Sequence, residues 1–436
     1  MNQIKEISER MGRSITLKLL IIGILILIML IPVNMVRNLI TERKTTSEEV
    51  NNEVSSSWGN EQTVTGPFIT IPYKTYYKVG KEVKETTNYA HFLPEQLNYK
   101  GEVIPEIRKR GIYKVVVYES KMEIKGDFTV PDFSFAGVNP NDVMWNHATI
   151  NMGITDMRGI QEGITVSCEN KNYELNPGIA TKDLVTTGVS TLIKINRESP
   201  MNFQIKLNLN GSKKLNFVPL GKETEVSMNS TWPHPSFSGE FLPRNHKITE
   251  KGFQASWKVL HLNRSFPQQW TDHAFDVMNS VFGVSLIIPV DHYQKSTRSI
   301  KYAIMFIALT FITFFFIEVI NRKRIHTIHY LLVGFALVIF YSLLISMSEH
   351  IPFNIAYLVS SVAVIALITA FGAGLFKNKK QTLTLLMVLI VLYIFLFTIL
   401  QLMDYALLMG NIGLFIVLAI VMYFTRKIKW NSNDNM

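Results

Sequence analysis

The sequence is poor in cysteine: its 436 residues contain one, Cys168, so no disulfide can form within the chain. Common catalytic motifs are missing as well, because there is no phosphate-binding loop, no glycine-rich dinucleotide loop after a strand and no nucleophile elbow. The ten histidines are scattered and include no His-Glu-x-x-His pair. We therefore predict no catalytic residue, no metal site and no cofactor. A disulfide-free domain of this length can still fold outside the cytosol, because it is large enough to bury its own core.

Charge is also sparse, at 18% of residues, and it is concentrated in the middle of the chain. The net charge of +10 does not predict nucleic acid as a partner, because Lys and Arg cluster beside apolar segments, where membrane topology explains them. The apolar residues gather towards the two ends. This distribution predicts one membrane unit and one water-soluble unit.

Six apolar segments are long enough to cross a membrane. An α-helix rises about 1.5 Å per residue, so about 20 apolar residues cross a hydrocarbon layer of about 30 Å. A soluble helix would alternate apolar and polar faces, which these segments do not do. We predict six transmembrane helices with the lipid bilayer as their partner, the last five forming a domain at 300–425: residues 15–36, 300–320, 328–347, 355–376, 383–402 and 405–423.

Loop charges predict the orientation of these helices. Since cytoplasmic loops carry an excess of Lys and Arg, both termini, residues 1–14 and 426–436, are predicted to be cytoplasmic and the central domain extracytoplasmic. The inverted orientation stays open, because Arg37 and Lys44 follow the first span on its predicted outer side. The prediction rests on basic connections at 321–324, 377–380 and 426–429, and on connections without Lys or Arg at 348–354 and 401–404.

The first span is either a cleaved signal peptide or an uncleaved anchor. It has the basic start of a signal peptide, but its apolar run is long and ends at Val36 without a small-x-small cleavage site. We predict an uncleaved anchor. The polar segment 37–60 that follows is predicted to be a helical or loose connector.

Residues 61–297 form the predicted extracytoplasmic domain, in which short segments alternate between apolar and polar residues. This alternation indicates strands with one buried face and one wet face, which is typical of antiparallel sheets. Repeated short strands separated by turns favour a sandwich. The predicted fold class is an α+β membrane protein with six transmembrane helices, one N-terminal and five C-terminal, and a large antiparallel β-sandwich-like domain. The alternation is clearest at 66–79, 150–154, 201–209 and 253–259.

Asn210-Gly211 is a sequence signal for a β-hairpin. A two-residue turn would place Leu207 opposite Lys214 on the core face, whereas a three-residue loop pairs Leu207 with Leu215. We predict the three-residue loop, since a slip by one residue would turn a whole strand face outward.

A helix is predicted over residues 271–283, where apolar residues recur at helical spacing, and a strand over 284–290. Asp272, His273 and Asp276 in this segment could form an acid–base cluster. They fit better as the start and the exposed face of the helix.

Ionisable residues at membrane depth remain as candidates for function, because a charge at a helix centre costs about 2.5–3.5 kcal/mol unless it is paired or hydrated. Glu318 lies near the predicted cytoplasmic end of its span, where Arg322 could pair with it. Glu349, His350 and Asp404 are predicted to gather at the outer surface. There they would dock the domain, bind a lipid headgroup or simply be solvated.

Several longer motifs combine proline, aromatic and charged residues at fixed places. They are Gly66-Pro67 to Ile71-Pro72-Tyr73, Trp232-Pro233-His234-Pro235-Ser236-Phe237 with Leu242-Pro243, Gly252-Phe253-Gln254-Ala255-Ser256-Trp257, Asp291-His292-Tyr293-Gln294-Lys295, Ser348-Glu349-His350-Ile351 and Asp404-Tyr405-Ala406-Leu407-Leu408. Nearly end to end, the sequence resembles the CreD family, inner membrane proteins described as cell envelope integrity proteins. It departs from the family pattern at Met403 and Lys429, where acidic residues are expected. The resemblance implies a bacterial inner-membrane protein under envelope-stress or two-component control, and it implies no catalytic residue.

Three functional hypotheses follow. The first is a non-enzymatic envelope protein whose periplasmic β domain binds an envelope component, a protein or a lipid. The second is a lipid-handling protein or solute transporter in which Glu349 and Asp404 line an outer entrance, although the spans contain little of the buried charge that transport paths need. The third is a membrane-anchored hydrolase with its site in the β domain. The sequence predicts no oligomeric state.

Overall fold

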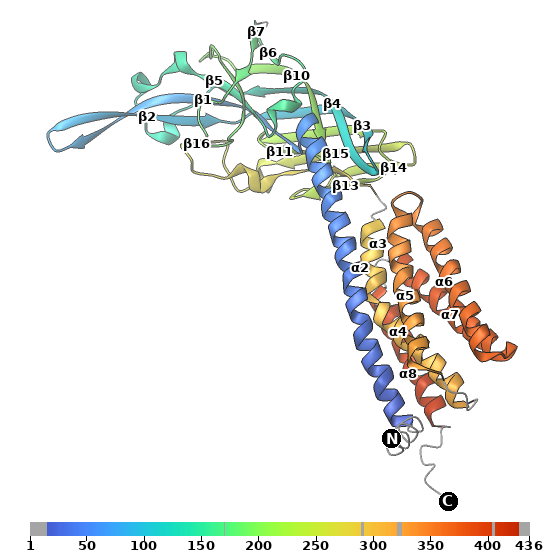
Figure 1. Ribbon diagram of the computed structural model, residues 1–436. Helices are drawn as coiled ribbons and strands as arrows, with labels where there is room; N and C mark the ends of the chain where they lie inside the picture. Colours follow the sequence, from blue (N-terminus) through green and yellow to red (C-terminus); the bar gives the residue numbers. More distant parts are fainter. Residues whose placement is uncertain (1–14, 170, 289–291, 321–324, 403–405, 427–436) are drawn as a thin grey trace, which may run out of the picture. The chain divides into compact units, whose positions relative to one another are not determined.

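The computed structural model is α+β and divides into two compact units. The membrane unit comprises Met1–Thr46 and Val290–Met436, and the β unit comprises Ser47–Pro289. Figure 1 shows the helices of the first and the strands of the second. The residues that the structure describes are 15–169, 171–288, 292–320, 325–402 and 406–426.

The membrane unit is helical. Its helices are α2 (Ile15–Trp58, which continues into the β unit), α3 (His292–Lys301), α4 (Ala303–Ile320), α5 (Thr327–Ser348), α6 (Phe353–Phe376), α7 (Lys379–Gln401) and α8 (Ala406–Thr425). Among the described residues, five helices are long and apolar enough to cross a membrane, namely α2, α4, α5, α6 and α7. α8 is a further apolar helix of 20 residues, and the sixth span stays a prediction.

Polar residues between the apolar runs set the helix ends. The His326 side chain caps α5 by accepting from the Ile328 N–H (3.5 Å), and the Asn378 side chain caps α7 by accepting from the Lys380 N–H (3.0 Å). α6 ends at Phe376, and the capping residue that follows it, Lys377, has a φ of 50°. The observed ends of α4 to α8 lie within a few residues of the predicted segments.

α2 is one continuous helix of 44 residues, so the predicted connector is helical as far as Trp58. At Gly334 of α5, an added Cβ would lie 2.7 Å from the Met29 sulfur, so this glycine lets the two helices approach closely. Residues three, four or seven apart share one face of a helix. α2 thus packs as a member of the helix bundle through one buried face, which consists of Ile22, Leu25, Met29, Val33 and Ile40.

The β unit contains two large sheets that share one hydrophobic core. One sheet has the order β13-β17-β11-β1-β5-β9-β8, with β2 on β1 and β16 on β2; the other has the order β14-β15-β12-β3-β4-β10-β6-β7. Rings from both sheets meet in the core, with Tyr99 and Phe217 centred 5.1 Å apart and Trp257 and Phe282 centred 5.9 Å apart. A sandwich arrangement stays a prediction. The strands are β1 (Gln62–Val79), β2 (Glu82–Phe92), β3 (Gln96–Arg110), β4 (Tyr113–Phe128), β5 (Thr149–Ile154), β6 (Thr165–Cys168), β7 (Lys171–Glu174), β8 (Asn176–Pro177), β9 (Gly188–Leu192), β10 (Met201–Ser212), β11 (Lys214–Val218), β12 (Glu223–Ser230), β13 (Pro235–Gly239), β14 (Asn245–Thr249), β15 (Gly252–Leu260), β16 (Gln269–Thr271) and β17 (Phe282–Leu286).

Both sheets are mixed, so the prediction of antiparallel sheets is wrong in part. β1 and β11 run parallel, with Gln62 opposite Leu215, and β3 and β12 run parallel, with Gln96 opposite Glu223. Alternation of apolar and polar residues indicates which face of a strand is buried, but it does not indicate whether the neighbouring strand runs parallel or antiparallel. The strands predicted at 66–79, 150–154, 201–209 and 253–259 are confirmed.

The predicted hairpin at Asn210-Gly211 is wrong. β10 continues through both residues and pairs with β4, where Gly211 lies opposite Tyr118. The chain then passes Lys213, which has a φ of 60°, and enters β11 in the other sheet. Close packing explains the glycine, because a Cβ on Gly211 would lie 2.3 Å from the Tyr118 hydroxyl oxygen.

The predicted helix at 271–283 is also wrong. β16 occupies its start, Asp272 has a φ of 55°, and only the short 3₁₀ helix η6 (Val277–Ser280) follows. The Asp272 N–H bonds to a carbonyl of β2 (2.8 Å), so sheet pairing overrides the helical spacing of the apolar residues. β17 begins earlier than the predicted strand, and residues 289–291 lie outside the described part of the chain.

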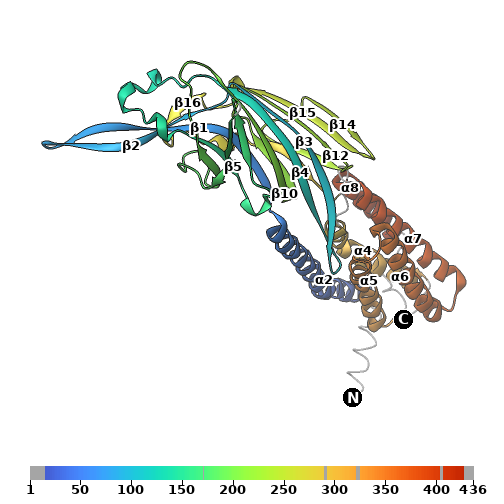
Figure 2. The same cartoon turned by 90° about the horizontal axis from the view of Figure 1, so that it is seen from above.

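β1 and β2 continue beyond the rest of their sheet as a two-stranded arm, residues 74–88 (Figures 1 and 2). β5 accompanies β1 only as far as Thr70, whereas β1 and β2 stay paired to their turn. An isolated two-stranded ribbon is marginally stable in water. The arm nevertheless exposes large apolar side chains: Tyr76 (53%), Tyr77 (50%), Val79 (50%) and Val83 (63%).

Candidate functional site

Glu318 lies near the end of α4 and is 7% exposed. The Lys18 ammonium of α2 forms an ion pair with it and also donates to the Ile325 carbonyl oxygen (3.0 Å). The Tyr330 hydroxyl of α5 donates to the other carboxylate oxygen (3.1 Å). The predicted partner, Arg322, lies outside the described residues. Glu318 therefore has both a cation and a hydroxyl as partners at membrane depth.

The Lys18–Glu318 pair joins α2 to α4, and Tyr330 adds α5. Burying a charge is costly, and removing one member of a buried pair leaves the other uncompensated. No local sequence pattern could have revealed this pair, since 300 residues separate the two side chains.

Glu349 follows the last turn of α5, and its carboxylate accepts a hydrogen bond from the Tyr293 hydroxyl of α3 (3.2 Å). His350 continues this turn through a bond from its N–H to the Met347 carbonyl oxygen (3.0 Å). Asp404, the third residue predicted for this surface, lies outside the described residues. The structure thus links Glu349 to α3, and Asp404 stays untested.

The β unit contains a buried polar network that sequence analysis missed. His91 of β2 and Thr70 of β1 are both fully buried. His91 Nδ1 lies 3.1 Å from Thr70 Oγ1, and His91 Nε2 lies 3.1 Å from an Asp183 carboxylate oxygen. The Asn151 side chain donates to Thr70 Oγ1 (3.2 Å). Burial lowers the pKa of His91, although Asp183 acts in the opposite direction, so the ring is neutral at pH 7.

This order of hydroxyl, imidazole and carboxylate resembles the relay that activates a nucleophile. Thr70 has no exposed surface, however, and its oxygen also accepts from Asn151, so it cannot reach a substrate in this structure. The network instead holds Asp183 in place. A polar residue among apolar neighbours was the available signal, because His91 lies between buried Ala90 and Phe92.

Asp183 also borders a cleft, which we call the threonine cleft, with a volume of about 330 Å³. His273 and Asp276, which the sequence placed on a helix, lie at this cleft together with Lys182. Asp272 does not line it, and its carboxylate accepts from a backbone N–H of β2 instead (3.3 Å). The structure therefore brings together two of the three residues of the predicted cluster and adds Asp183.

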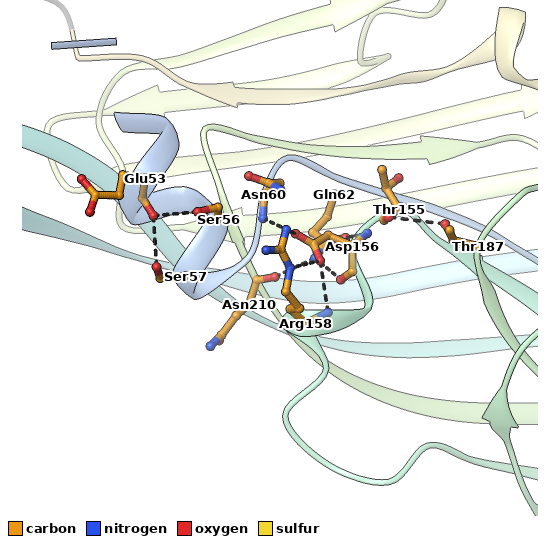
Figure 3. A network of polar contacts seen from close by, with 10 residues as sticks. All are labelled: Glu53, Ser56, Ser57, Asn60, Gln62, Thr155, Asp156, Arg158, Thr187 and Asn210. Atoms are coloured by element: carbon orange, nitrogen blue, oxygen red, sulfur yellow. Dashed lines mark hydrogen bonds and ion pairs between the residues drawn. The ribbon is translucent and has the colours of Figure 1, made fainter. Parts of the chain in front are cut away.

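A third polar cluster fixes the end of α2 to the β unit (Figure 3). The Asp156 carboxylate accepts from the Asn60 N–H (3.0 Å) and from two nitrogens of the Arg158 guanidinium (2.9 and 2.8 Å). Gln62 donates to the carbonyl oxygens of Asp156 and Asn210 (both 2.9 Å). Burial raises the pKa of Asp156, but the hydrogen bonds from Arg158 and Asn60 outweigh it and hold the pKa below its usual range.

Two comparisons with known proteins show what the chain is similar to. The family model described as "Inner membrane protein CreD" matches residues 14–431. One curated relative, the inner membrane protein CreD of Escherichia coli (strain K12), is 32% identical over 416 residues, which cover 93% of this chain and 91% of the relative.

Proposed function

Because the chain belongs to the CreD family of inner membrane proteins, we propose that it supports the integrity of the bacterial cell envelope without catalysing a reaction. In this proposal the membrane unit holds the protein in the inner membrane. The β unit lies in the periplasm and binds an envelope component, either a protein or a lipid.

The arm carries the binding part of this proposal. Its exposed apolar side chains lie on both faces of the two-stranded ribbon, with Tyr77 and Val79 on one face and Tyr76 and Val83 on the other, and the described chain leaves all four open to solvent. Surfaces of this kind mark interaction sites on soluble domains. Figures 1 and 2 show the arm projecting from the β unit, where a partner can reach both of its faces.

We further propose that the chain crosses the membrane six times, with α8 as the last span and both termini in the cytoplasm. The Lys18–Glu318 pair supports α2 and α4 as antiparallel spans, because it puts the beginning of α2 and the end of α4 at one depth. In this proposal the chain crosses the membrane twice between Lys18 and Glu318, once through α2 and back through α4. Both residues then lie on the same side of the membrane. The basic connections then fall on the cytoplasmic side.

Complementation of a deletion strain, scored for permeability to detergent and dye, tests the envelope role. Full-length protein should restore the barrier. A variant with Tyr77→Ser and Val79→Ser in the arm should fail to restore it, whereas Ile248→Ser, which changes an equally exposed residue of β14 (47%), should succeed.

A second comparison uses residues 1–297 alone. If they restore the barrier, the β unit is the working part, and if only the full chain does so, the membrane unit is required as well. A deletion strain with an unchanged barrier would refute the envelope role. Arm variants that behave like the wild type would refute the arm as the binding surface.

A further inference from the structure

The threonine cleft lies between strands β1 and β5, the loop 182–187 and the segment 273–278. Its volume of about 330 Å³ is at the small end of the range for ligand sites, about 300–1,000 Å³. A Cβ on Gly153 would lie 2.8 Å from the Val185 side chain, so this glycine allows the loop to pack closely on β5. Five threonines line the cleft, of which Figure 3 shows two, Thr155 and Thr187: Thr63, Thr65, Thr155, Thr186 and Thr187.

The charged groups at the cleft retain unused hydrogen-bonding capacity. Asp183 uses one carboxylate oxygen to bind His91, and Asp276 uses Oδ1 to accept from the Met278 N–H (2.9 Å). Within the described residues, the second oxygen of each carboxylate and the Lys182 ammonium have no side-chain partner. His273 is held by a contact of its Nδ1 with the Asp183 carbonyl oxygen (2.7 Å).

The buried network behind the cleft fixes one of its walls. His91 binds the Asp183 side chain, and the Asn151 side-chain oxygen accepts from the Ala180 N–H (3.3 Å). Both His91 and Asn151 are buried, so the chain is anchored at Ala180 and Asp183 from inside the sheet. Binding sites gain precision when groups behind them lock the contacting side chains. This arrangement holds Asp183 ready for a ligand.

The chemistry of the lining restricts what can bind. Two carboxylates repel phosphate and carboxylate ligands, and a wholly apolar ligand would desolvate them without compensation. The described residues contain no group of three or more His, Cys, Asp or Glu side chains that could hold a metal ion. Carboxylates accept hydrogen bonds from hydroxyl groups, Lys182 can donate to them, and Ile154, Val185 and Met278 offer an apolar wall to C–H groups.

We propose that the threonine cleft binds one ring of an uncharged polyhydroxylated ligand, a sugar unit, either free or within a glycan. This proposal rests on the proposed function in one respect, that the β unit faces the envelope. Asp183 and Asp276 accept from the ring hydroxyls, Lys182 donates, and His91 is a positioning residue that acts through Asp183.

Saturation-transfer NMR on the full-length protein in nanodiscs tests the proposal. The probes are glucose, N-acetylglucosamine and the soluble N-acetylglucosamine tetramer, and the tetramer distinguishes a glycan from a free sugar. We expect transfer to at least one probe. Asp276→Asn and Asp183→Asn should each weaken binding about tenfold or more, since a hydrogen bond to a charged group is lost. Asp142→Asn, which changes a half-buried aspartate away from the cleft, should not.

Absence of transfer to all three probes would overturn the proposal, as would equal transfer in the Asp276→Asn protein. Loss of transfer on adding a chelator would do the same, because it would assign the binding to a metal ion. Asp276 is exposed, so its substitution leaves the fold intact, and an unchanged melting temperature verifies this. The complementation test is separate: sugar binding without an envelope defect refutes only the proposed function, and a defect without sugar binding refutes only the cleft.

Discussion

Removal of Lys18 should destabilise the membrane unit more than removal of Glu318. The Glu318 side chain is only 8% exposed, so without its cation it would be left in hydrocarbon, at a cost of about 2.5–3.5 kcal/mol. The Lys18 side chain is 25% exposed, and lysine can extend its ammonium towards water. Glu318→Gln leaves only this lysine without its partner, and it should therefore lower the free energy of unfolding of the membrane unit by only about 1 kcal/mol.

The pair can be measured by a double-mutant cycle with Lys18→Met and Glu318→Gln. Because the chain has a single cysteine, a Cys168→Ser background allows donor and acceptor dyes on cysteines at Leu20 of α2 and Ile339 of α5, both exposed. Energy transfer during an SDS titration in mixed micelles then reports when α2 leaves the bundle. The double variant should lose about 1–2 kcal/mol less free energy of unfolding than the two single variants lose together.

Two further variants sharpen this experiment. The charge swap Lys18→Glu with Glu318→Lys should recover part of the stability lost by either single charge reversal. Lys301→Met, which removes an exposed lysine of α3, should change the stability by less than about 0.5 kcal/mol. Strictly additive losses, or a Lys18→Met protein as stable as the wild type, would refute the ion pair as a tie between α2 and α4.

Three predictions concern the β unit, which holds five of the six tryptophans and can be followed by their fluorescence. Burial lowers the pKa of His91 below its unfolded value of about 6.5, so on acidification the imidazole is protonated in the unfolded state before it is protonated in the folded state. The free energy of unfolding should therefore fall as the pH drops below about 6.5, by at most about 1.4 kcal/mol per pH unit. Urea titrations at several pH values should show that the free energy of unfolding of the His91→Gln protein lacks this dependence on pH. An equal dependence in the wild type and the variant would contradict the prediction. Gly211→Ala should cost about 1–3 kcal/mol by overpacking against Tyr118, whereas Gly163→Ala, whose Cβ would meet its nearest neighbour at an ordinary contact distance of 3.8 Å, should cost little; equal melting temperatures would count against the close contact. Cys168 is 4% exposed and burial raises its thiol pKa to about 11, so an impermeant maleimide should label it in spheroplasts only after denaturation, and rapid native labelling would show that it is accessible.

Apolar length predicted the helices well, because one-dimensional composition decides whether a segment can cross a membrane. Alternation also located β1, β5, β10 and β15, because it depends on residues next to each other in sequence. The alternation pattern did not predict how strands pair when the two strands are far apart in the sequence. The parallel pairing of Gln62 with Leu215 joins segments far apart in the chain, and nothing near either residue encodes it.

The glycine at 211 illustrates a second limit. Its sequence context, Asn-Gly, is a turn signal, yet a tyrosine on the neighbouring strand β4 occupies the space where a side chain would be. Local propensity and tertiary packing can require the same residue for different reasons. The candidate sites share this limit, since His91 and Asp183 are 92 residues apart.

The contacts of Glu318 bear on the rival transport hypothesis. A carrier needs ionisable groups within the membrane that exchange partners as the substrate passes. Glu318 is instead committed to Lys18 and Tyr330, which tie three helices together, and α2 continues from this tie into the polar cluster around Asp156. The one buried carboxylate described in the membrane unit therefore has a structural task that accounts for its presence at that depth. This favours a membrane unit that holds and orients α2 over one that moves a solute.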